Sequence, residues 1–527
     1  MRMLRLYIFV ILLSFSALIS SAGDIEKTDY IQIILYGQSL SMGWEAPRAI
    51  TTDSISGNYM LGSSPLVRGW EATPNKLNPL VATVWNNGGE QPIVSCVNVF
   101  SNLYRQNLES GQKFIGVTGG EGGQTIEKLS KECTNNGYYQ SSFVKILDGT
   151  KAALGNEKTV SCPAVIFMQG EYNCNEESWY KNQGLMPGTN GTTDKNEYKR
   201  LLLILKNNMQ NDIMQKYGQS QKPLFFIYQT SGWYLREKEM PISMAQYEFA
   251  EENDDVVFLN PHYALPDYGG GHLSTNGYRW YGEIMGKILY DELVDKKPYT
   301  PVYPKNFTVK DDSLTIEFHV PSPPLVLDTW TNAKASYYGF SVYKNGSTVL
   351  LKSVELKDND KVVITANDHL TGEIEVVYAG NKTSGTGNLR DSYEYASMYR
   401  YFDDFADSKK ETYTPKDMNG IKIYGQHYPM YNWSAGFYKK INQNSSSIST
   451  NAGSRISIYP NPAKDFIEIA SIPDNSIIRI VDATGKVVET MVCSNEPMRI
   501  ALNLSRGIYF IKIENDKSFM IEKLIVE

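Results

Sequence analysis

The chain has 527 residues, too many for one ordinary domain, and its length suggests about three domains. Hydrophobic residues make up 42% of the chain and charged residues 21%, as in soluble globular proteins. The formal net charge of −7 argues against nucleic acid or an anionic membrane as the main partner. The 36 tyrosines are typical of β-rich structure, and they also suit surfaces that bind sugars.

Residues 1–22 have the pattern of a secretory signal peptide. Arg2 and Arg5 give a positively charged start, and residues 6–19 form an apolar core that is short for a bilayer span. Small residues at 20–22 suit cleavage. An N-terminal membrane anchor would have the same appearance. Nothing later in the sequence is apolar over a sufficient length, so we expect no membrane span in the mature protein.

Residues 23–297 alternate strand-like and helical segments. Short apolar runs, several of them bounded by Gly or Pro, predict buried parallel strands. These runs are 30–36, 114–117, 164–168, 224–228 and 256–259. Apolar residues at helical spacing predict helices over 95–108 and 197–215. The repeated order of strand and helix predicts a three-layer α/β domain with a central parallel sheet.

The pattern changes near Pro298. Residues 298–440 consist of short alternating runs with turn signals, which predicts an all-β sandwich domain. Residues 441–455 are polar and low in complexity, as in a flexible linker. Residues 456–527 return to short strand-like runs and predict a small C-terminal β-sandwich.

Two segments of the predicted middle domain are dense in aromatic and polar residues. They are residues 387–392 and 424–433. Such segments form a sugar-binding face, a lid beside the first domain, or a packing surface that covers its flank. The composition alone does not choose among these three.

Three loops that follow predicted strands carry residues suited to acyl transfer. Ser39, in Gly37-Gln38-Ser39, lies where α/β sheets place their ligands, at the carboxyl end of a strand. The glycine-rich run 119–123 can point a backbone N–H at a developing oxyanion, and its spacing fits no dinucleotide or P-loop motif. Gln169 can offer a side-chain N–H to the same oxyanion, and Glu171 can anchor its loop.

His272 is the candidate base. It stands between a glycine run and a predicted helix start, which favours a position in a cleft, although a structural histidine is the alternative. Its second ring nitrogen must be held by a carboxylate or carbonyl, so that the basic nitrogen faces the serine. Asp267, five residues earlier, is the nearest acidic candidate.

These blocks, in this order, resemble the SGNH hydrolases, and within them the carbohydrate acetylesterase branch that includes sialate O-acetylesterases. The resemblance covers about residues 30–295. It implies that Ser39 is the nucleophile and His272 the general base. It further implies an oxyanion hole formed by the N–H groups of Ser39 and Gly123 and the amide of Gln169. No metal and no organic cofactor is implied. The matching blocks are Gly37-Gln38-Ser39, Gly122-Gly123-Gln124-Thr125-Ile126, Gln169-Gly170-Glu171 and His272-Leu273.

The chain departs from this family at two positions. The family's acid stands three residues before the histidine, where this chain has Gly269, so Asp267, another carboxylate or a carbonyl must orient His272. Leu40 replaces an Asn that many relatives have. The resemblance implies a serine esterase that removes acetyl groups from oligo- or polysaccharides through an acyl-serine. The alternatives are an SGNH hydrolase of lipids or thioesters, and a catalytically dead surface protein that binds carbohydrate.

The last segment closely resembles the type A sorting domain of the type IX secretion system of Bacteroidota. This resemblance implies passage through the periplasm, followed by secretion or attachment at the cell surface, with the type IX machinery as partner. In such proteins the segment is usually removed. The matching runs are residues 458–463, 481–488, 504–509 and 523–526.

The chain has five cysteines and no CxxC pair, so a cysteine-based metal site is not expected. Export makes disulfides possible. Cys133 and Cys174 both follow loops at one edge of the predicted sheet, so we expect a disulfide between them. Cys96 lies on the same edge and could replace either of them as a partner.

Overall fold

The computed structural model describes residues 25–133, 137–174, 191–269, 271–403, 409–442, 457–470, 476–482, 487–492, 498–515 and 518–527. The chain divides into two compact units, Met1–Asn444 and Ser445–Glu527. The predicted signal peptide, most of the predicted linker and Cys493 lie outside the described residues. Within the described ranges, no helix is both long enough and apolar enough to cross a membrane.

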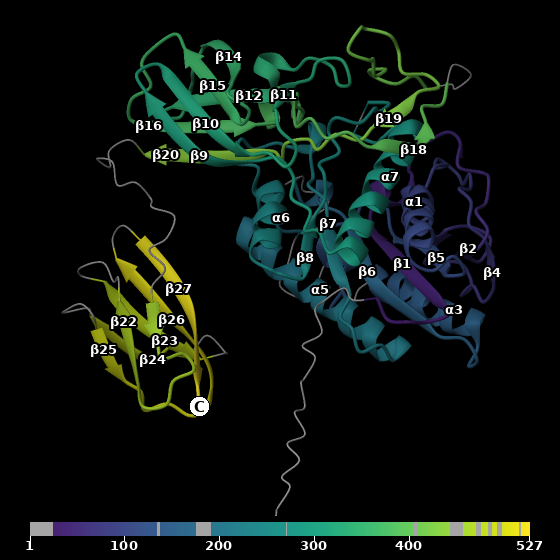
Figure 1. Cartoon of the computed structure of the whole chain (residues 1–527), viewed down its shortest axis with the longest axis horizontal. Helices are drawn as coiled ribbons and strands as arrows, with labels where there is room; N and C mark the ends of the chain where they lie inside the picture. Colours follow the sequence, from purple (N-terminus) through teal and green to yellow (C-terminus); the bar gives the residue numbers. More distant parts are fainter. Residues whose placement is uncertain are drawn as a thin grey trace, which may run out of the picture. The chain divides into compact units, whose positions relative to one another are not determined.

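The first unit is built on a mostly parallel sheet with the strand order β4-β2-β5-β1-β6-β7-β8, and β3 beside β5 (Figure 1). Its one antiparallel pair in this order joins the edge strand β4 to β2. The five predicted strands are confirmed, whereas β2, β3 and β4 were not predicted because each is too short to show a period. The bounds are β1 Tyr30–Gly37, β2 Asn58–Leu61, β3 Leu66–Val67, β4 Leu77–Pro79, β5 Lys113–Gly120, β6 Val160–Met168, β7 Leu224–Ile227 and β8 Val256–Phe258.

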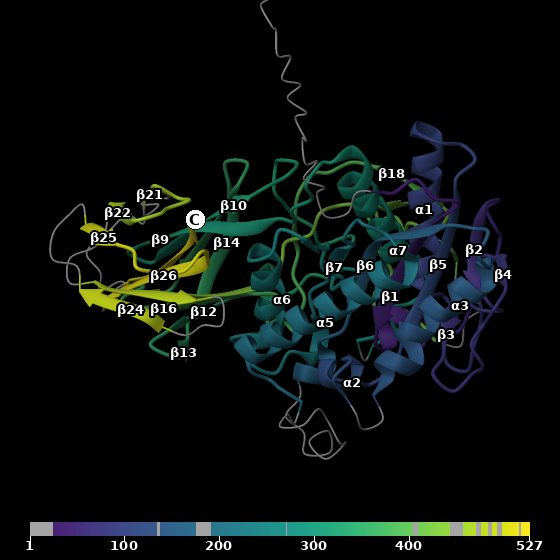
Figure 2. The same cartoon turned by 90° about the horizontal axis from the view of Figure 1, so that it is seen from below.

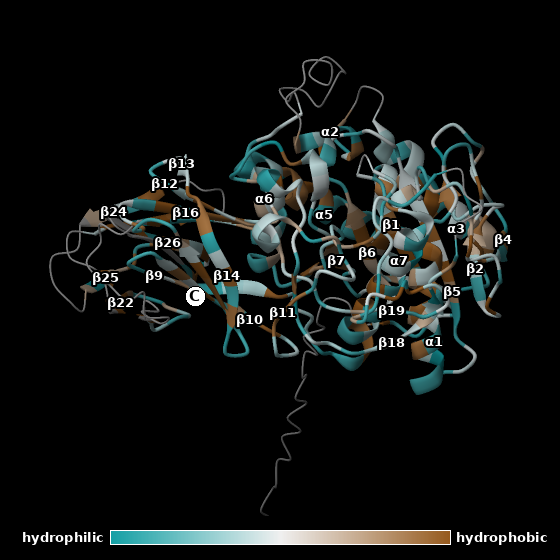
Figure 3. Cartoon of the chain, turned by 90° about the horizontal axis from the view of Figure 1, so that it is seen from above, coloured by the Kyte–Doolittle hydropathy of each residue, from teal (hydrophilic) through white to brown (hydrophobic). Residues whose placement is uncertain are grey.

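Both faces of this sheet are covered by helices, which makes the predicted three-layer α/β domain. Ile31, Ile33 and Leu35 of β1 share one apolar cluster with residues of α1 and α7, whereas Ile34 and Tyr36 pack with α3, α5 and α6. Every β1 residue is buried, and the strand is apolar apart from Gln32 and Gly37, as expected of a strand covered on both faces. Figure 2 shows the helices on either side of the sheet, and Figure 3 shows that its strands are largely hydrophobic. The helices are α1 Pro92–Asn107, α2 Ile126–Leu129, α3 Lys145–Leu154, α5 Lys195–Tyr217, α6 Pro241–Glu251 and α7 Thr275–Tyr290.

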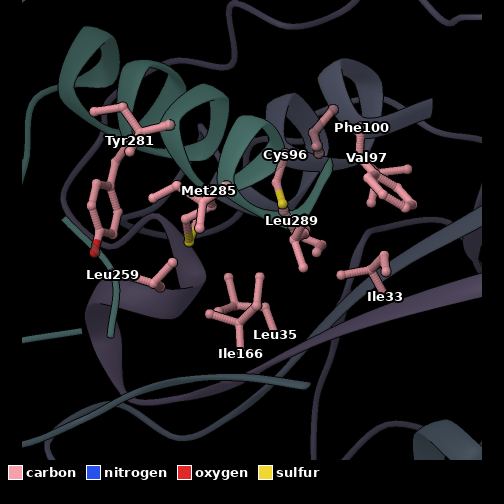
Figure 4. Close-up of a cluster of buried hydrophobic side chains, with 14 of the residues drawn as sticks. Ile33, Leu35, Cys96, Val97, Phe100, Ile166, Leu259, Tyr281, Met285 and Leu289 are labelled. Carbon is pink, nitrogen blue, oxygen red and sulfur yellow. The ribbon is translucent and has the colours of Figure 1, made fainter. Parts of the chain in front are cut away.

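Helices α1 and α7 pack closely because α7 carries glycines at the contact. A Cβ on Gly282 would lie 2.2 Å from the carbonyl oxygen of Pro92, and one on Gly286 would lie 2.4 Å from that of Cys96. A side chain at either glycine would therefore push the two helices apart. Figure 4 shows Met285 and Leu289 of α7 beside Cys96 of α1, above the strand residues.

The middle domain is a β-sandwich whose two main sheets enclose one apolar cluster. The segments 387–392 and 424–433 contain buried residues, among them Asn388 and Asp391, which favours the packing interpretation. Trp433 packs in this cluster, whereas Tyr428 packs in the apolar cluster of the α/β domain. One sheet contains β9 Tyr303–Lys310, β10 Ser313–His319, β14 Leu351–Lys357 and β15 Lys361–Ala366. The other contains β12 Phe340–Lys344, β13 Ser347–Thr348, β16 Glu373–Tyr378 and β20 Phe437–Asn442. Two short pairs complete it, β11 Val326–Leu327 with β17 Leu389–Arg390 and β18 Ala396–Arg400 with β19 His427–Pro429.

The second unit is a small β-sandwich with an aliphatic core of its own. Isoleucines alternate along its strands, for example Ile478 and Ile480, so that one face of each sheet is buried. One sheet holds β21 Ser457–Tyr459, β22 Phe466–Ala470 and β25 Met498–Ala501. The other holds β23 Ile477–Asp482, β24 Val487–Val492, β26 Gly507–Asn515 and β27 Ser518–Val526.

The expected disulfide between Cys133 and Cys174 is wrong, because Cys174 is a free cysteine. Cys96 and Cys162 are also free and fully buried. Burial raises the pKa of the Cys174 thiol well above its usual value. Cys96 and Cys162 pack as small apolar groups within the core, and Cys174 is partly buried against it.

The contact between α1 and α7 predicts that a larger side chain at Gly286 destabilises the fold. Gly286→Val should lower the free energy of unfolding by about 1–3 kcal/mol or more, because the added methyl groups meet the backbone of α1. Urea unfolding followed by circular dichroism would measure this loss. Gly111→Ala is the matched control, because a Cβ there meets nothing within 4 Å. An equal, small effect of both substitutions would contradict the described packing.

Candidate active site

Ser39 lies at the carboxyl end of β1, where three strand ends come together without intervening side chains. A Cβ on Gly37 would lie 2.0 Å from the carbonyl oxygen of Met168 in β6. One on Gly120 in β5 would lie 1.9 Å from the carbonyl oxygen of Gly37. Gly120 also has a φ of +120°, which favours glycine. Ser39 then begins a short 3-10 turn, Ser39–Met42, and is 6% exposed.

The structure brings His272 to Ser39 although the two are 233 positions apart. The distance between His272 Nε2 and Ser39 Oγ is 2.8 Å, which is a hydrogen bond. His272 stands directly before the start of α7, where the Ser274 side chain caps the helix by accepting a hydrogen bond from Gly277 N–H. The capped helix start fixes the chain direction behind His272.

The carboxylate nearest the second nitrogen of His272 is that of Glu45, which the sequence did not indicate. Glu45 Oε1 lies 3.7 Å from His272 Nδ1, and Glu45 Oε2 lies 3.0 Å from Lys409 Nζ. Glu45 has a φ of +65°, a conformation that costs a side-chain-bearing residue about 1–2 kcal/mol. Strain of this kind gathers at functional sites, and here it accompanies a carboxylate facing the histidine.

Burial lowers the pKa of His272 below its usual 6.5, and this is the largest influence on it. The negative charge of Glu45 raises that pKa, and the positive charge of Lys409 lowers it. The imidazole is therefore neutral near pH 7, the state in which it can accept a proton. Lys409 belongs to the middle domain, so this domain influences the ionisation of His272.

Asp267 lies near the His272 loop but its carboxylate is engaged elsewhere. Its Oδ1 accepts hydrogen bonds from Gly269 N–H, at 2.9 Å, and from the hydroxyl of Thr412 in the middle domain. Its backbone forms an antiparallel bridge with Leu273. Asp267 thus closes the loop that carries His272, whereas Glu45 faces the imidazole.

The glycine-rich loop passes beside Ser39, as the sequence predicts for an oxyanion site. A Cβ on Gly122 would lie 3.9 Å from the Cβ of Ser39. Gly123 has a φ of +68° and packs against Tyr172, so glycine is required there. In the part of the chain that the structure describes, the N–H groups of Ser39 and Gly123 donate to no protein acceptor. These two donors are available to an anion.

Gln169 has a different environment from the one expected for an oxyanion donor. Its side-chain Nε2 donates to Gln124 O at 3.1 Å and to Asn173 Oδ1 at 2.8 Å, and its Oε1 accepts from Tyr198 OH at 2.7 Å. Both amide hydrogens are thereby engaged, and the side chain is fully buried. The contact with Gln124 ties the end of β6 to the glycine-rich loop.

Glu171 anchors the loop after β6, as its position in the sequence indicates. Its buried carboxylate accepts hydrogen bonds from Gln38 Nε2 at 2.5 Å, from Thr230 Oγ1 at 2.6 Å and from Tyr228 OH. Burial raises the pKa of this carboxyl group. Because Gln38 precedes Ser39, the hydrogen bond from Gln38 to Glu171 helps to fix the turn that carries Ser39.

The comparison with protein families assigns the C-terminal unit. Residues 457–527 match the family model described as a secretion system C-terminal sorting domain. The second unit is a type IX secretion sorting domain. The sorting domain marks the chain for export by that system, as its sequence motifs predict. No curated protein sequence matches the chain.

Solved structures similar to the chain include three carbohydrate esterases. A carbohydrate acetylesterase from Xanthomonas citri has a TM-score of 0.46 at 12% identity, covering 77% of this chain and 80% of its own. A family two carbohydrate esterase from Clostridium thermocellum has 0.28 at 9% identity, covering 50% and 64%. A carbohydrate acetylesterase from Sinorhizobium meliloti has 0.26 at 12% identity, covering 50% and 99%. These similarities are too low to assign a reaction to the chain, which depends on the side chains at the site.

The two charges around His272 predict opposite shifts of its pKa. Glu45→Gln should lower the pKa of His272, because the imidazolium loses its nearest anion, and Lys409→Met should raise it, because Glu45 is no longer offset. NMR titration of the imidazole signals would measure both, since the chain has only five histidines. Asp267→Asn should move this pKa least. A larger shift with Asp267→Asn than with Glu45→Gln would reverse the assignment.

Proposed function

We propose that this chain is an exported serine esterase that removes O-acetyl groups from complex carbohydrates. The observation that carries the proposal is the 2.8 Å contact between Ser39 Oγ and His272 Nε2 beside two unengaged backbone N–H groups. A serine, a neutral imidazole and preorganised donors are the groups that acyl transfer requires. The resemblance of the sequence blocks to carbohydrate acetylesterases supplies the substrate class.

The reaction begins with proton transfer from Ser39 Oγ to His272 Nε2 as the serine oxygen attacks the ester carbonyl carbon. The carbonyl oxygen becomes an oxyanion that accepts hydrogen bonds from the N–H groups of Ser39 and Gly123. His272 then returns the proton to the sugar oxygen, and the C–O bond breaks. Water, deprotonated by His272, attacks the acetyl-serine, and acetate leaves as Ser39 recovers its proton.

Glu45 is the carboxylate that stabilises the imidazolium formed in each step. At 3.7 Å it lies slightly beyond a hydrogen bond in this state, and such contacts commonly shorten when substrate binds. We assign Asp267 to positioning, because its carboxylate closes the loop that carries His272. Gln169 is likewise assigned to holding the glycine-rich loop.

The site of action follows from the sorting domain and the predicted signal peptide. Together they support passage through the periplasm and release outside the cell or retention on its surface. The partners are then the type IX machinery and an acetylated oligo- or polysaccharide. The described steps use only side chains, backbone N–H groups and water.

Ser39→Ala should lower the rate of p-nitrophenyl acetate hydrolysis on the order of a thousandfold or more, because it removes the nucleophile. Ser41→Ala is the matched control in the same turn and should keep most of the activity. The release of p-nitrophenol measures both rates. Equal inertness of the wild type and Ser39→Ala would support a surface protein that binds carbohydrate without hydrolysing it. Preference for a long-chain p-nitrophenyl ester would indicate a lipid or thioester hydrolase.

The two acids should differ in the step they affect. Glu45→Gln should lower kcat by about tenfold or more, since the imidazolium loses its charge partner in the transition state. Asp267→Asn should act less on kcat and more on thermal stability, because it loosens the loop tied to Thr412. Kinetics and thermal melting of both variants separate the two roles. A larger loss of kcat in Asp267→Asn would return the acid's role to Asp267.

A further inference from the structure

A cavity of about 420 Å³ opens beside the His272 loop, between the α/β domain and the middle domain. Gly271 and Leu273, the two neighbours of His272, both line it. Its volume lies within the range of small-ligand sites in proteins. None of the steps proposed for ester cleavage uses this cavity.

Both domains of the first unit contribute walls to the cavity. The α/β domain supplies Trp233 from the loop after β7, together with Leu265 and Pro266. The middle domain supplies Thr331, Asn332 and Ala333 from one loop, and Thr386 and Tyr413 from two others. The Gly232 N–H donates to Gly385 O at 3.2 Å, so the two domains are in direct backbone contact at the cavity wall.

The wall combines apolar surface with hydroxyl and amide groups. Trp233 is 43% exposed, and Asn332, Thr386 and Tyr413 bring amide and hydroxyl groups to the wall. A pyranose ring offers both complements, apolar C–H faces and a rim of hydroxyl groups.

The charge of the lining restricts the kind of sugar. No lysine or arginine is among the described residues that line the cavity, and its one carboxylate is that of Asp267. His262, which also lines it, is buried, and burial lowers its pKa to about 4, so it is neutral near pH 7. A carboxylated sugar would enter with no cation to pair it and with Asp267 to repel it.

Two aromatic side chains beside the cavity pack against the loop that carries His272. A Cβ on Gly271 would lie 2.2 Å from Tyr234 Cε2 and 2.8 Å from Trp233 Nε1, so these two rings pack directly against the residue before His272. The ring centroids of Trp233 and Tyr234 are 4.8 Å apart. A ligand that packs against Trp233 therefore touches a ring that contacts Gly271, the residue before His272.

We propose that this cavity is a subsite for a neutral sugar residue next to the acetylated one, formed jointly by the α/β domain and the middle domain. The substrate of the proposed esterase is then a neutral oligo- or polysaccharide in place of a single acetylated sugar or an acidic glycan. This inference rests on the proposed function for the reaction but not for the binding.

Binding is tested without catalysis, in the full chain carrying Ser39→Ala. Isothermal titration with xylohexaose, cellohexaose and mannohexaose as neutral probes, and with hexagalacturonate as the acidic probe, should show binding of at least one neutral hexasaccharide and none of hexagalacturonate. Ala333→Phe should weaken that binding about tenfold, which corresponds to 1.4 kcal/mol, because the ring enters the cavity from an exposed rim position. Ala152→Phe, at an exposed position on α3, is the matched control.

Unchanged binding in Ala333→Phe, or equal binding of hexagalacturonate, would overturn the proposal.

Turnover distinguishes failure of the subsite from failure of the esterase. Ala333→Phe should raise KM for O-acetylated xylotetraose and leave hydrolysis of p-nitrophenyl acetate within about twofold of wild type. A parallel loss on both substrates would show a disturbed His272 loop and overturn the assignment. If the wild type hydrolyses neither ester while still binding a neutral hexasaccharide in an Ala333-sensitive way, the esterase is wrong and the subsite stands.

Discussion

The site depends on the close approach of three strand ends, in which Gly37 and Gly120 let backbone meet backbone. Any side chain at these positions would collide with a carbonyl oxygen of the next strand. The approach brings the N–H of Ser39 beside the glycine-rich loop, and it leaves the Ser39 hydroxyl at the sheet edge. An oxyanion site of backbone N–H groups requires this geometry, because such donors cannot be moved into place by side-chain rotation.

A buried hydrogen-bond network holds this arrangement from behind. Glu171 accepts from Gln38, next to Ser39, and Gln169 donates to Gln124, at the end of the glycine-rich loop. Each contact joins two strand ends that are far apart in sequence. Because these buried groups are hydrogen-bonded to one another, they favour one arrangement of the loops over alternatives.

The middle domain is part of the site as well as a neighbour of it. Lys409 pairs with Glu45, Glu411 accepts from Ser274 at the start of α7, and Thr412 donates to Asp267. One short segment thereby contacts Glu45, the cap of α7 and the loop around His272. The pKa of His272 and the walls of the adjoining cavity both depend on this segment.

The sequence by itself determined the layered fold, the positions of the main strands along the chain, the sorting domain and the candidates Ser39 and His272. Strand periodicity, glycine placement and short motifs are local, so they can be read directly from neighbouring residues. Tertiary structure alone decided that Glu45 faces His272, that Lys409 offsets it, and that the amide of Gln169 is engaged. The positive φ of Glu45 cannot be predicted from the residues around it, because side-chain-bearing residues rarely adopt this conformation. Its contact with Lys409 spans 364 positions. Contacts of that separation form only when the domains pack, which is why Asp267, the near neighbour in sequence, was the expected acid.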